Sequence, residues 1–430
     1  MERLPLVTND ASQQAARQPE LGDVFRAYGA GFLRARRAAL SIDQQRALRE
    51  LAVCRTATLG GHRRECGHLL YQYNSCRNRN CVTCGWGKRL RWREHRMAEM
   101  LEVEYFHVVL TLPDALAQLA RYNQTVMRDI LCRAAAHAIL SIGREWKHLC
   151  AQMGLIIVPH GWGQLMNQHL HAHILAPGGG ISIDGERWVP LPRGFFLPRT
   201  WLRQRFRDTY LAMLKKAYWQ GRLVFRGPLA AIQMPDAFER WLDALARREW
   251  ITHAASTDAY RGPAGREQTV KYLAHYASGV AMSNKRIQSI DDGQVTFTYK
   301  DYRRQEDPGT PAPIRLMTLP AFEFIERFLS HVPKNGSRRF RYYGFLAPGV
   351  RREKLALIRR MIGQAEPEAA GDRKEAPEEE TDPLEANRCP ACGEAAMVTV
   401  WSRPKPRVSE IMATAWGDLF QIRLTEWDEF

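Results

Sequence analysis

An alternating run of histidines constrains the fold of this chain more than any other stretch of its sequence. In QHLHAHILAP, residues 168–177, histidines occupy positions 169, 171 and 173, with Leu170 and Ala172 between them. Successive side chains of a β-strand point to opposite faces, so the run predicts a strand with one histidine face and one apolar face. Imidazoles two positions apart on a strand can bind the same divalent ion. We therefore expect a strand that carries a metal site.

A second predicted strand, 154–164, precedes this run, and its sequence GLIIVPHGWGQ also alternates toward its end. The connecting loop is short, which favours an antiparallel hairpin. A turn near Met166–Gln168 would place His160 roughly across from His173. Three histidines would then converge on one ion. Such nitrogen ligands suit Mn, Zn, Ni or Co, or Mg with water in the remaining positions.

The rest of the chain predicts a mixture of strands and helices. Strands are expected where β-branched and aromatic residues run together, and helices where apolar residues recur every three or four positions. Thr318 is expected to cap a helix of sequence PAFEFIERFLSHV. The other expected strands are 105–113, 248–255 and 295–303, and the other expected helical regions are 1–50, 115–152, 200–247 and 266–282.

The expected helix at 266–282 contains Tyr272 and Tyr276, four residues apart. Residues at this spacing share one face of a helix. A tyrosine hydroxyl can attack phosphorus and form a covalent phosphotyrosine, and two tyrosines allow two successive strand transfers. The same spacing fits an amphipathic helix whose tyrosines border a core. The nucleophile interpretation therefore depends on the histidine strand and on the charge of the chain.

The cysteines are clustered in a way that predicts zinc. Of nine, five lie between Cys54 and Cys84 and two more form a CPAC sequence at 389–392, while Cys132 and Cys150 are isolated and expected to be buried. An odd, clustered count without a signal peptide favours metal binding over disulfides. A short arginine-rich segment has little core, so zinc would contribute to its folding. The predicted ligands are Cys66, Cys76, Cys81 and Cys84, with Cys54, His62, His68, Cys389 and Cys392 as alternatives.

The charge of the chain points to nucleic acid. A formal net charge of +16 favours polyanionic partners. Guanidinium groups neutralise phosphates and aromatic rings stack on unpaired bases. The sequence has no apolar run long enough for a membrane span, so we expect a cytoplasmic, nucleoid-associated protein. The expected DNA-binding residues are Arg77, Arg79, Lys88 and Arg89 near the cysteines, and Arg338, Arg339, Arg341 and Tyr342 in KNGSRRFRYYGF.

Several of these motifs together resemble a known family. HLHAH resembles the HUH motif of two histidines around a hydrophobic residue, and YLAHY resembles a paired-tyrosine motif. In order along the chain, YFHVVLTLP, HGWGQ, HAHILAPGGG, YLAHYASGVAMSNKRI and YKDYR resemble the rolling-circle insertion-sequence transposases. The resemblance also covers YNSCRNRNCVTC and HVPKNGSRRFRYYGFL, and it runs from about 50 to 362. This two-tyrosine bacterial group is related to Helitrons and to plasmid replication initiators. Two departures are Ala172, where a bulkier residue is usual, and His275, where arginine is common.

The resemblance implies an α+β fold with a central antiparallel sheet, an RRM-like palm flanked by helices. It implies a nuclease that nicks single-stranded DNA at mobile-element ends and in target DNA, with Tyr272 and Tyr276 as nucleophiles. The tyrosine takes the 5′ phosphate and leaves a free 3′ hydroxyl. Mg or Mn would be the catalytic metal and Zn a structural one. The implied metal ligands are His171, His173 and, as a third, His160, with His169 and Gln164 as alternatives.

Two other functions fit parts of this pattern. A plasmid replication initiator or relaxase shares the nuclease site but usually lacks an N-terminal zinc module. A zinc-dependent DNA-binding regulator would bind DNA without cleaving it.

The sequence predicts six regions along the chain. They are a helical region at 1–50, a zinc-binding and DNA-binding module at 51–97, an HUH nuclease domain at 98–310 with a helical insertion near 196–247, a basic helical DNA-binding region at 311–365, an acidic flexible linker at 366–386, and a CxxC tail at 387–430.

Overall fold

The computed structural model describes residues 18–66, 68–84, 95–97, 99–145, 147, 149–256, 280–305, 310–365, 389, 392 and 398–420. The chain forms two compact units: unit 1 contains residues 1–87, 280–332 and 373–430, and unit 2 contains 88–279 and 333–372. The expected tyrosine helix at 266–282, with Tyr272 and Tyr276, falls almost wholly outside the described residues, as does the expected acidic linker at 366–386. Unit 1 joins segments that are distant in sequence, and the predicted domain boundaries stay a prediction.

Unit 2 is built on a five-stranded antiparallel sheet in the order β13-β5-β6-β3-β9. The α+β class and the antiparallel central sheet are therefore confirmed. The strands expected at 105–113, 154–164, 169–176 and 248–255 all form part of it. Its strands are β3 (Tyr105–Thr111), β5 (Gly154–Trp162), β6 (Gln168–Pro177), β9 (Ile251–Ser256) and β13 (Arg341–Gly344).

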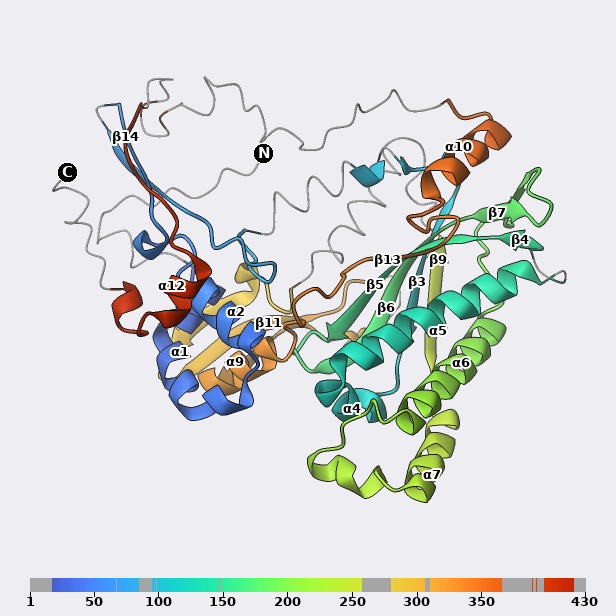
Figure 1. The fold of residues 1–430 in the computed structure, drawn as a ribbon, viewed down its shortest axis with the longest axis horizontal. Coiled ribbons are helices and arrows are strands. Elements are labelled where there is room, and N and C mark those ends of the chain that lie inside the picture. Colours follow the sequence, from blue (N-terminus) through green and yellow to red (C-terminus); the bar gives the residue numbers. More distant parts are fainter. Residues whose placement is uncertain are drawn as a thin grey trace. The chain divides into compact units, whose positions relative to one another are not determined.

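One face of this sheet is apolar and is covered by helices. Val108 and Leu110 of β3 and Ala172 and Ile174 of β6 are buried in one core with α5 and α6. Figure 1 shows these two helices lying side by side across the sheet. This burial removes the apolar side of the histidine strand from water, which stabilises the strand by about 25 cal/mol per Å² of apolar surface. The helices of unit 2 are α4 (Ala117–Tyr122), α5 (Gln124–Arg144), α6 (Arg199–Trp219), α7 (Pro235–Ala246) and α10 (Arg351–Ile362).

The opposite face of the sheet is divided along its strands. At one end, Val158 and Leu175 are buried in a second core with Leu355 and Ile358 of α10. The residues that follow Val158 and precede Leu175 on the same face are histidines. A single face thus passes from an apolar end to an imidazole-lined end.

The glycine run after the histidine strand allows a close approach of backbones. It enters β7 (Gly179–Ser182), which pairs with β4 (Ala151–Gln152) and β8 (Trp188–Pro190) in a small separate sheet. A Cβ atom added to Gly180 would lie 2.7 Å from the carbonyl oxygen of Gln152, and one on Gly179 would lie 2.5 Å from the ring of Trp188. Only glycine fits where the neighbouring strands come this close.

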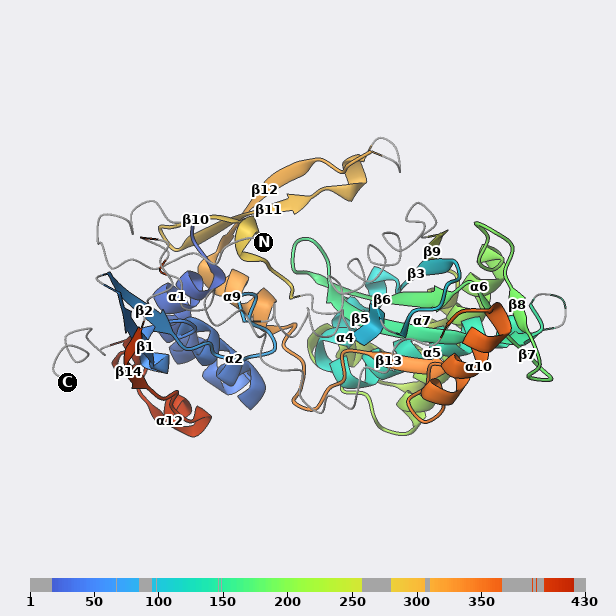
Figure 2. The same ribbon diagram turned by 90° about the horizontal axis from the view of Figure 1, so that it is seen from above.

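Unit 1 combines helices with two three-stranded sheets, in the orders β14-β1-β2 and β10-β11-β12. The rings of Phe25 on α1 and Phe328 on α9 pack edge to face with their centroids 5.4 Å apart. Those of Phe297 on β11 and Phe324 on α9 do so at 5.7 Å, so these three elements share an aromatic core. Figure 2 shows β10, β11 and β12 as a long antiparallel ribbon. The elements are α1 (Leu21–Arg36), α2 (Ile42–Ala52), β1 (Gly61–Glu65), β2 (Leu69–Tyr73), β10 (Ile287–Asp291), β11 (Gln294–Lys300), β12 (Ile314–Pro320), α9 (Ala321–Leu329), β14 (Val398–Arg403) and α12 (Val408–Ala413).

Three local predictions were wrong. The hairpin turns at Gly163–Asn167, closed by a hydrogen bond from the Gly163 N–H to the Asn167 carbonyl, so it turns earlier than expected. Thr318 lies in β12 and its hydroxyl pairs at 2.8 Å with Thr296 on β11, so it does not cap α9, whose N-cap is Pro320. Cys150 is exposed, although Cys132 is buried as expected.

None of the described helices is both long enough and apolar enough to cross a bilayer.

The edge strand β13 gives a direct test of this fold. Gly344 ends it with a φ of +63°, and an added Cβ would lie 1.8 Å from the carbonyl oxygen of Met153 on the adjoining segment. We expect Gly344→Ala to lower the free energy of unfolding by about 2–4 kcal/mol. Denaturant unfolding measures this, with Gly349→Ala as the control because no atom lies within 4 Å of its added Cβ. Equal stability of the two variants would show that the strand end is not built this tightly.

Candidate metal centres

The pairing of β5 with β6 brings three histidines together. His160 lies directly across from His171, and Val158 lies across from His173, with a bulge between His160 and Trp162. The pairing expected from the sequence, His160 across from His173, was therefore wrong by two residues, because the turn comes earlier. All three imidazoles still share one face, and one ring nitrogen of each lies within 4.8 Å of the others.

The hydrogen bonds around these imidazoles set the direction of their nitrogens. His171 Nδ1 lies 2.9 Å from the carbonyl oxygen of His169. A carbonyl only accepts, so Nδ1 carries the proton and Nε2 offers a lone pair. That Nε2 lies 3.1 Å from Nε2 of His173. Two nitrogens bound to one ion at about 2.1 Å and at a right angle would be about 3.0 Å apart. The pair is therefore spaced as adjacent ligands of one metal ion.

The protonation of these groups suits a metal site. Burial lowers the pKa of His171 to about 4. Burial holds the pKa of His173 far below its usual range, and the neighbouring imidazoles of His160, His171 and His107 lower it further. His160 and His173 are both buried. The imidazoles of His171 and His173 are thus neutral at pH 7, and neutral imidazole is the form that binds metals.

Two histidines near this group were missed by the sequence analysis. His107 on β3 lies with its Nε2 2.9 Å from Nδ1 of His173, and the two rings stack at 8°. His253 on β9 pairs with Val109 of β3 and so lies on the same face as His107. Burial lowers the pKa of His107 to about 4, and the neighbouring His253 contributes to this shift. The strand sequence YFHVVLT looks wholly buried, so its single histidine gave no signal of a site.

The two alternative ligands lie at the margin of the group. His169 shares the face, and its Nδ1 lies 3.7 Å from an Asp114 carboxylate oxygen. Gln164 lies in the turn of the hairpin. The group of mutually close metal-type side chains is His160, His171 and His173.

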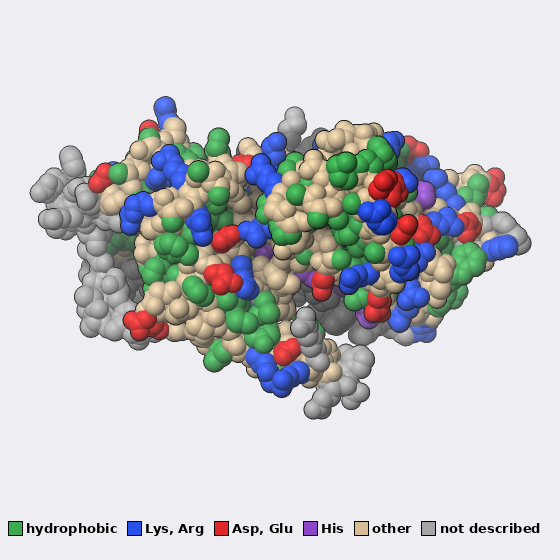
Figure 3. Space-filling model, turned by 90° about the horizontal axis from the view of Figure 1, so that it is seen from below, with side chains coloured by type: hydrophobic (Ala, Val, Ile, Leu, Met, Phe, Trp, Pro, Cys, Tyr) green, Lys and Arg blue, Asp and Glu red, His purple; other side chains and the backbone are tan. Residues whose placement is uncertain are grey.

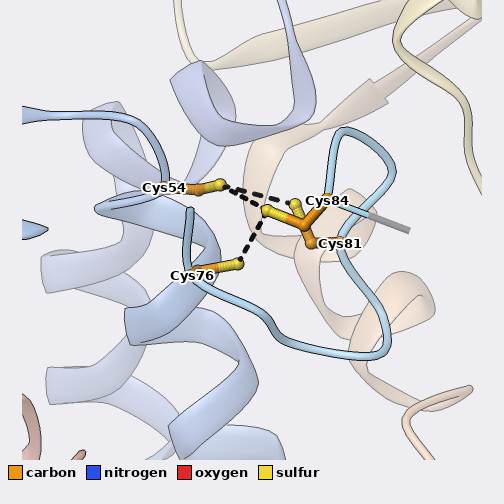
Figure 4. Close-up of side chains that lie close together, drawn as sticks. All are labelled: Cys54, Cys76, Cys81 and Cys84. Carbon is orange, nitrogen blue, oxygen red and sulfur yellow. Dashed lines mark hydrogen bonds between the residues drawn. The ribbon is translucent and has the colours of Figure 1, made fainter. Parts of the chain in front are cut away.

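A second candidate centre consists of cysteines in unit 1: Cys54, Cys76, Cys81 and Cys84. Figure 4 shows their sulfur atoms pointing toward one another from the turn after α2, the loop after β2 and the turn that follows. Sulfur separations are 3.2 Å for Cys54–Cys84, 3.6 Å for Cys54–Cys81 and 3.7 Å for Cys76–Cys84. Bonds of about 2.3 Å in a tetrahedral zinc site place sulfurs about 3.8 Å apart. The four thiols therefore fit a closed structural zinc site.

The surrounding contacts hold this loop in place. The backbone N–H of Asn78 donates to Cys76 Sγ at 3.4 Å, and the Asn78 amide donates to the buried Glu50 carboxylate of α2 at 2.6 Å. Lys405 Nζ donates to the Cys76 carbonyl at 2.6 Å. Hydrogen bonds of this kind orient metal ligands.

The grouping of cysteines differs from the predicted set in one member. Cys54, given as an alternative, stands with Cys76, Cys81 and Cys84, while Cys66 belongs to another group with His68, Cys389 and Cys392. The physical reason is that Cys66 lies in the turn that follows β1, whereas Cys54 lies in the turn that follows α2. His62 is exposed on β1 and belongs to neither group.

The residues expected to bind DNA lie in different surroundings. Arg341 forms an ion pair with Asp129 of α5 at 2.8 Å, and the Tyr342 ring lies under the guanidinium groups of Arg96 and Arg351 at 5.5 Å and 5.2 Å. Both are therefore occupied by internal contacts. Arg338 and Arg339 lie in the segment before β13, and Arg77 and Arg79 lie in the cysteine loop, while Lys88 and Arg89 are outside the described residues.

Charge on unit 2 is mixed on one side. Figure 3 shows Lys and Arg alternating there with Asp and Glu. Several of these charges are paired, for example Arg205 with Glu145 at 2.7 Å and Lys215 with Glu239 at 2.8 Å. The helices α6 and α7 therefore present balanced charge where these pairs lie.

Comparisons with known proteins agree with this picture. Residues 154–354 match a family model described as "Putative transposase", and residues 24–112 match the IS91 "Transposase zinc-binding domain". The chain is 40% identical over 391 residues to "Putative transposase y4qJ" of Sinorhizobium fredii, covering 89% of this chain and 95% of that protein. It is 27% identical over 328 residues to "Transposase for insertion sequence element IS801" of Pseudomonas savastanoi pv. phaseolicola, covering 74% of each. No solved structure shows a significant match.

The fold, the cysteine group and these relatives define a DNA transposase with a zinc-binding domain. The zinc-binding match spans α1, α2 and the Cys54 group, and the second match spans most of the five-stranded sheet. The chain belongs to the IS91 family of transposases, which confirms the resemblance found in its sequence.

The cysteine group predicts a metal-dependent stability. We expect Cys76→Ser to remove about one zinc ion per chain and to lower the free energy of unfolding of unit 1 by more than about 4 kcal/mol, because the zinc site supplies folding energy. Elemental analysis and thermal unfolding measure the two effects. Cys150→Ser is the control, since this exposed cysteine belongs to neither group. Full zinc content in Cys76→Ser would exclude this residue as a ligand.

Proposed function

We propose that this transposase nicks and rejoins single-stranded DNA at the ends of a mobile element in rolling-circle-type transposition. Tyr272 and Tyr276 are the proposed nucleophiles, and they lie outside the described residues. The observation that carries the proposal is the convergence of three histidines on one face of an antiparallel sheet in a chain of this family.

The proposed catalytic metal is Mn or Mg, and its ligands would be His160, His171 and His173. A divalent ion held there supplies Lewis-acid chemistry that polarises the scissile phosphate. Three imidazoles favour Mn over Mg, which prefers oxygen ligands. The support for this assignment is the 3.1 Å spacing of the His171 and His173 Nε2 atoms and the neutral state of both rings.

The proposed cleavage step exchanges one phosphodiester bond for another. A tyrosine hydroxyl oxygen attacks the phosphorus, and the bond from phosphorus to the 3′ oxygen breaks. The tyrosine loses its proton, and the departing 3′ oxygen takes one up and becomes a free hydroxyl. The 5′ end stays bound as a phosphotyrosine. Because one phosphodiester replaces another, a later attack by a 3′ hydroxyl reverses the step without a separate energy source.

His107 is proposed as a positioning residue for His173. With its Nε2 at 2.9 Å, His107 can accept a hydrogen bond from the Nδ1–H of His173 and leave the His173 Nε2 lone pair directed at the centre. In the other tautomer the same nitrogen of His173 carries a proton and cannot bind metal. The identity of residue 107 therefore controls whether His173 is available as a ligand.

Contacts with DNA are proposed for arginines of both units. Arg338 is exposed and Arg77 lies in the cysteine loop, and neither has an internal ion pair among those of the described residues. Arg339, Arg79, Lys88 and Arg89 are proposed with them from the sequence. Arg341 and Tyr342 are proposed to act indirectly, because their side chains contact Asp129, Arg96 and Arg351.

The tyrosines give the direct test of the reaction. Full-length protein is mixed with labelled single-stranded DNA carrying the element ends, with Mn or Mg, and analysed on a denaturing gel. We expect a denaturant-stable protein–DNA adduct that requires metal and is absent in Tyr272→Phe/Tyr276→Phe. The single variants then report which tyrosine acts first. Tyr218→Phe is a control because its hydroxyl is bound to the Gln233 carbonyl in the helical part of unit 2.

Each other outcome has a defined meaning. Cleavage that survives in the double variant would show that water or another residue is the nucleophile. Binding that persists without metal, with no cleavage of the correct ends, would favour the regulator. Cleavage confined to a replication origin would favour a replication initiator.

Metal binding separates the role of His107 from that of the ligands. We expect His171→Ala to abolish Mn binding at this centre and His107→Ala to weaken it by about 10–100-fold, because outer partners of metal ligands contribute that much. His107→Gln should retain most of the affinity, since its amide oxygen can still accept a hydrogen bond from the Nδ1–H of His173. Calorimetric titration with Mn measures the affinities, and His137→Ala, on α5, is the control. Equal affinities for His107→Ala and the parent protein would contradict the positioning role.

A further inference from the structure

A second group of metal-type side chains lies at the end of the sheet β14-β1-β2. One ligand atom of each of its four members lies within 4.8 Å of the others, and the Sγ atoms of Cys66 and Cys392 are 3.9 Å apart. We propose that a second structural zinc ion fastens the C-terminal segment of the chain to the β1–β2 hairpin, with four ligands: Cys66, His68, Cys389 and Cys392.

The donor set and its spacing suit zinc. Three thiols and one imidazole form a Cys₃His set, and the sulfur separation agrees with the value of about 3.8 Å for a tetrahedral site. A disulfide would need an S–S distance of about 2.05 Å. Cys389 is buried, with 1% of its surface exposed, so its thiol points into the group and away from water.

The backbone brings these residues together from distant parts of the sequence. Cys66 follows β1 and its N–H donates to the His68 carbonyl at 3.3 Å, so both sit in the turn of the hairpin. On the neighbouring strand Val398 pairs with Glu65, which places the start of β14 beside that turn. Cys66 and Cys392 are 326 positions apart in the chain. A metal ion here closes a very long loop, which is where such a link most restricts the unfolded chain.

The outer strand β14 of this sheet has exposed apolar side chains. Val398 and Val400 of β14 are 63% and 50% exposed, so this strand is not fixed by a buried apolar face. Further along, Arg49 donates to the Thr414 carbonyl at 2.8 Å and Lys405 donates to the Cys76 carbonyl. These contacts join the C-terminal segment to α2 and to the first cysteine group. The second ion would bind at the other end of the sheet, beside the hairpin turn at Cys66, where neither the Arg49 nor the Lys405 contact lies.

The proposed ion takes two of its four ligands from outside the zinc-binding family match. That match covers residues 24–112, so it includes Cys66 and His68 but neither cysteine of the C-terminal pair. The inference does not rest on the nuclease reaction, and zinc counting tests it without DNA.

The test counts zinc in full-length protein purified under reducing conditions, by native mass spectrometry and elemental analysis. Counts are compared with the parent protein, so any metal at the histidine centre cancels. We expect Cys389→Ser/Cys392→Ser to lose one zinc ion per chain and to keep the other. Amide hydrogen exchange should become faster in β14. An unchanged zinc count, or a disulfide detected in place of the metal, would overturn the proposal.

Substitutions at position 68 keep the test valid if the double variant fails to fold. We expect His68→Ala to weaken the binding of one zinc ion by more than about tenfold, because losing a ligand exceeds the loss of an outer partner. His68→Cys should retain the ion, since it completes a Cys₄ set. His62→Ala is the matched control, as this exposed imidazole on β1 belongs to neither group. Equal zinc affinity in His68→Ala and His68→Cys would overturn the assignment.

Discussion

The pairing register between β5 and β6 is the constraint on which the proposed nuclease site depends. His160 lies across from His171 only because the hairpin turns at Gly163–Asn167 with a bulge beside Trp162. A slip of one residue would turn every histidine to the other face. The register is fixed by burial of Ala172 and Ile174 against the helices, so the apolar core determines where the imidazoles point. The site is thus a consequence of packing on the opposite side of the same strand.

Unit 1 combines an aromatic core with two groups of metal-type side chains. Its aromatic core joins α1, α9 and β11, whereas Val398 and Val400 of the sheet β14-β1-β2 are exposed. Where a core is small, metal ligands can supply the missing folding energy. Two cysteine-rich groups lie there, one within the N-terminal sequence and one that draws on the C-terminal segment. If both hold zinc, the second ion joins the hairpin turn at Cys66 and His68 to the segment that carries Cys389 and Cys392.

Much of this was predictable from sequence, and the failures have physical causes. The alternation at 168–177 predicted the strand and its histidine face. Side chains alternate between the two faces of a strand whichever residues it pairs with on the next strand. The partner of each histidine was not predictable, because a turn shifted by two residues changes it while leaving the pattern intact. His107 was missed since it sits alone in an apolar strand and gains meaning only beside His173. The exchange of Cys54 for Cys66 depends on folding of the hairpin, which spacing along the chain does not encode.

The histidine face of the sheet is proposed to bind one divalent ion, and anomalous diffraction from crystals soaked in Mn would locate that ion. We expect a single peak in unit 2, bounded by one ring nitrogen each of His160, His171 and His173. That peak should vanish in crystals of His171→Ala, while zinc peaks at the cysteines of unit 1 stay. A peak at His107 and His253 instead, or no peak at this face when the zinc peaks are present, would show that His160, His171 and His173 do not form the metal site.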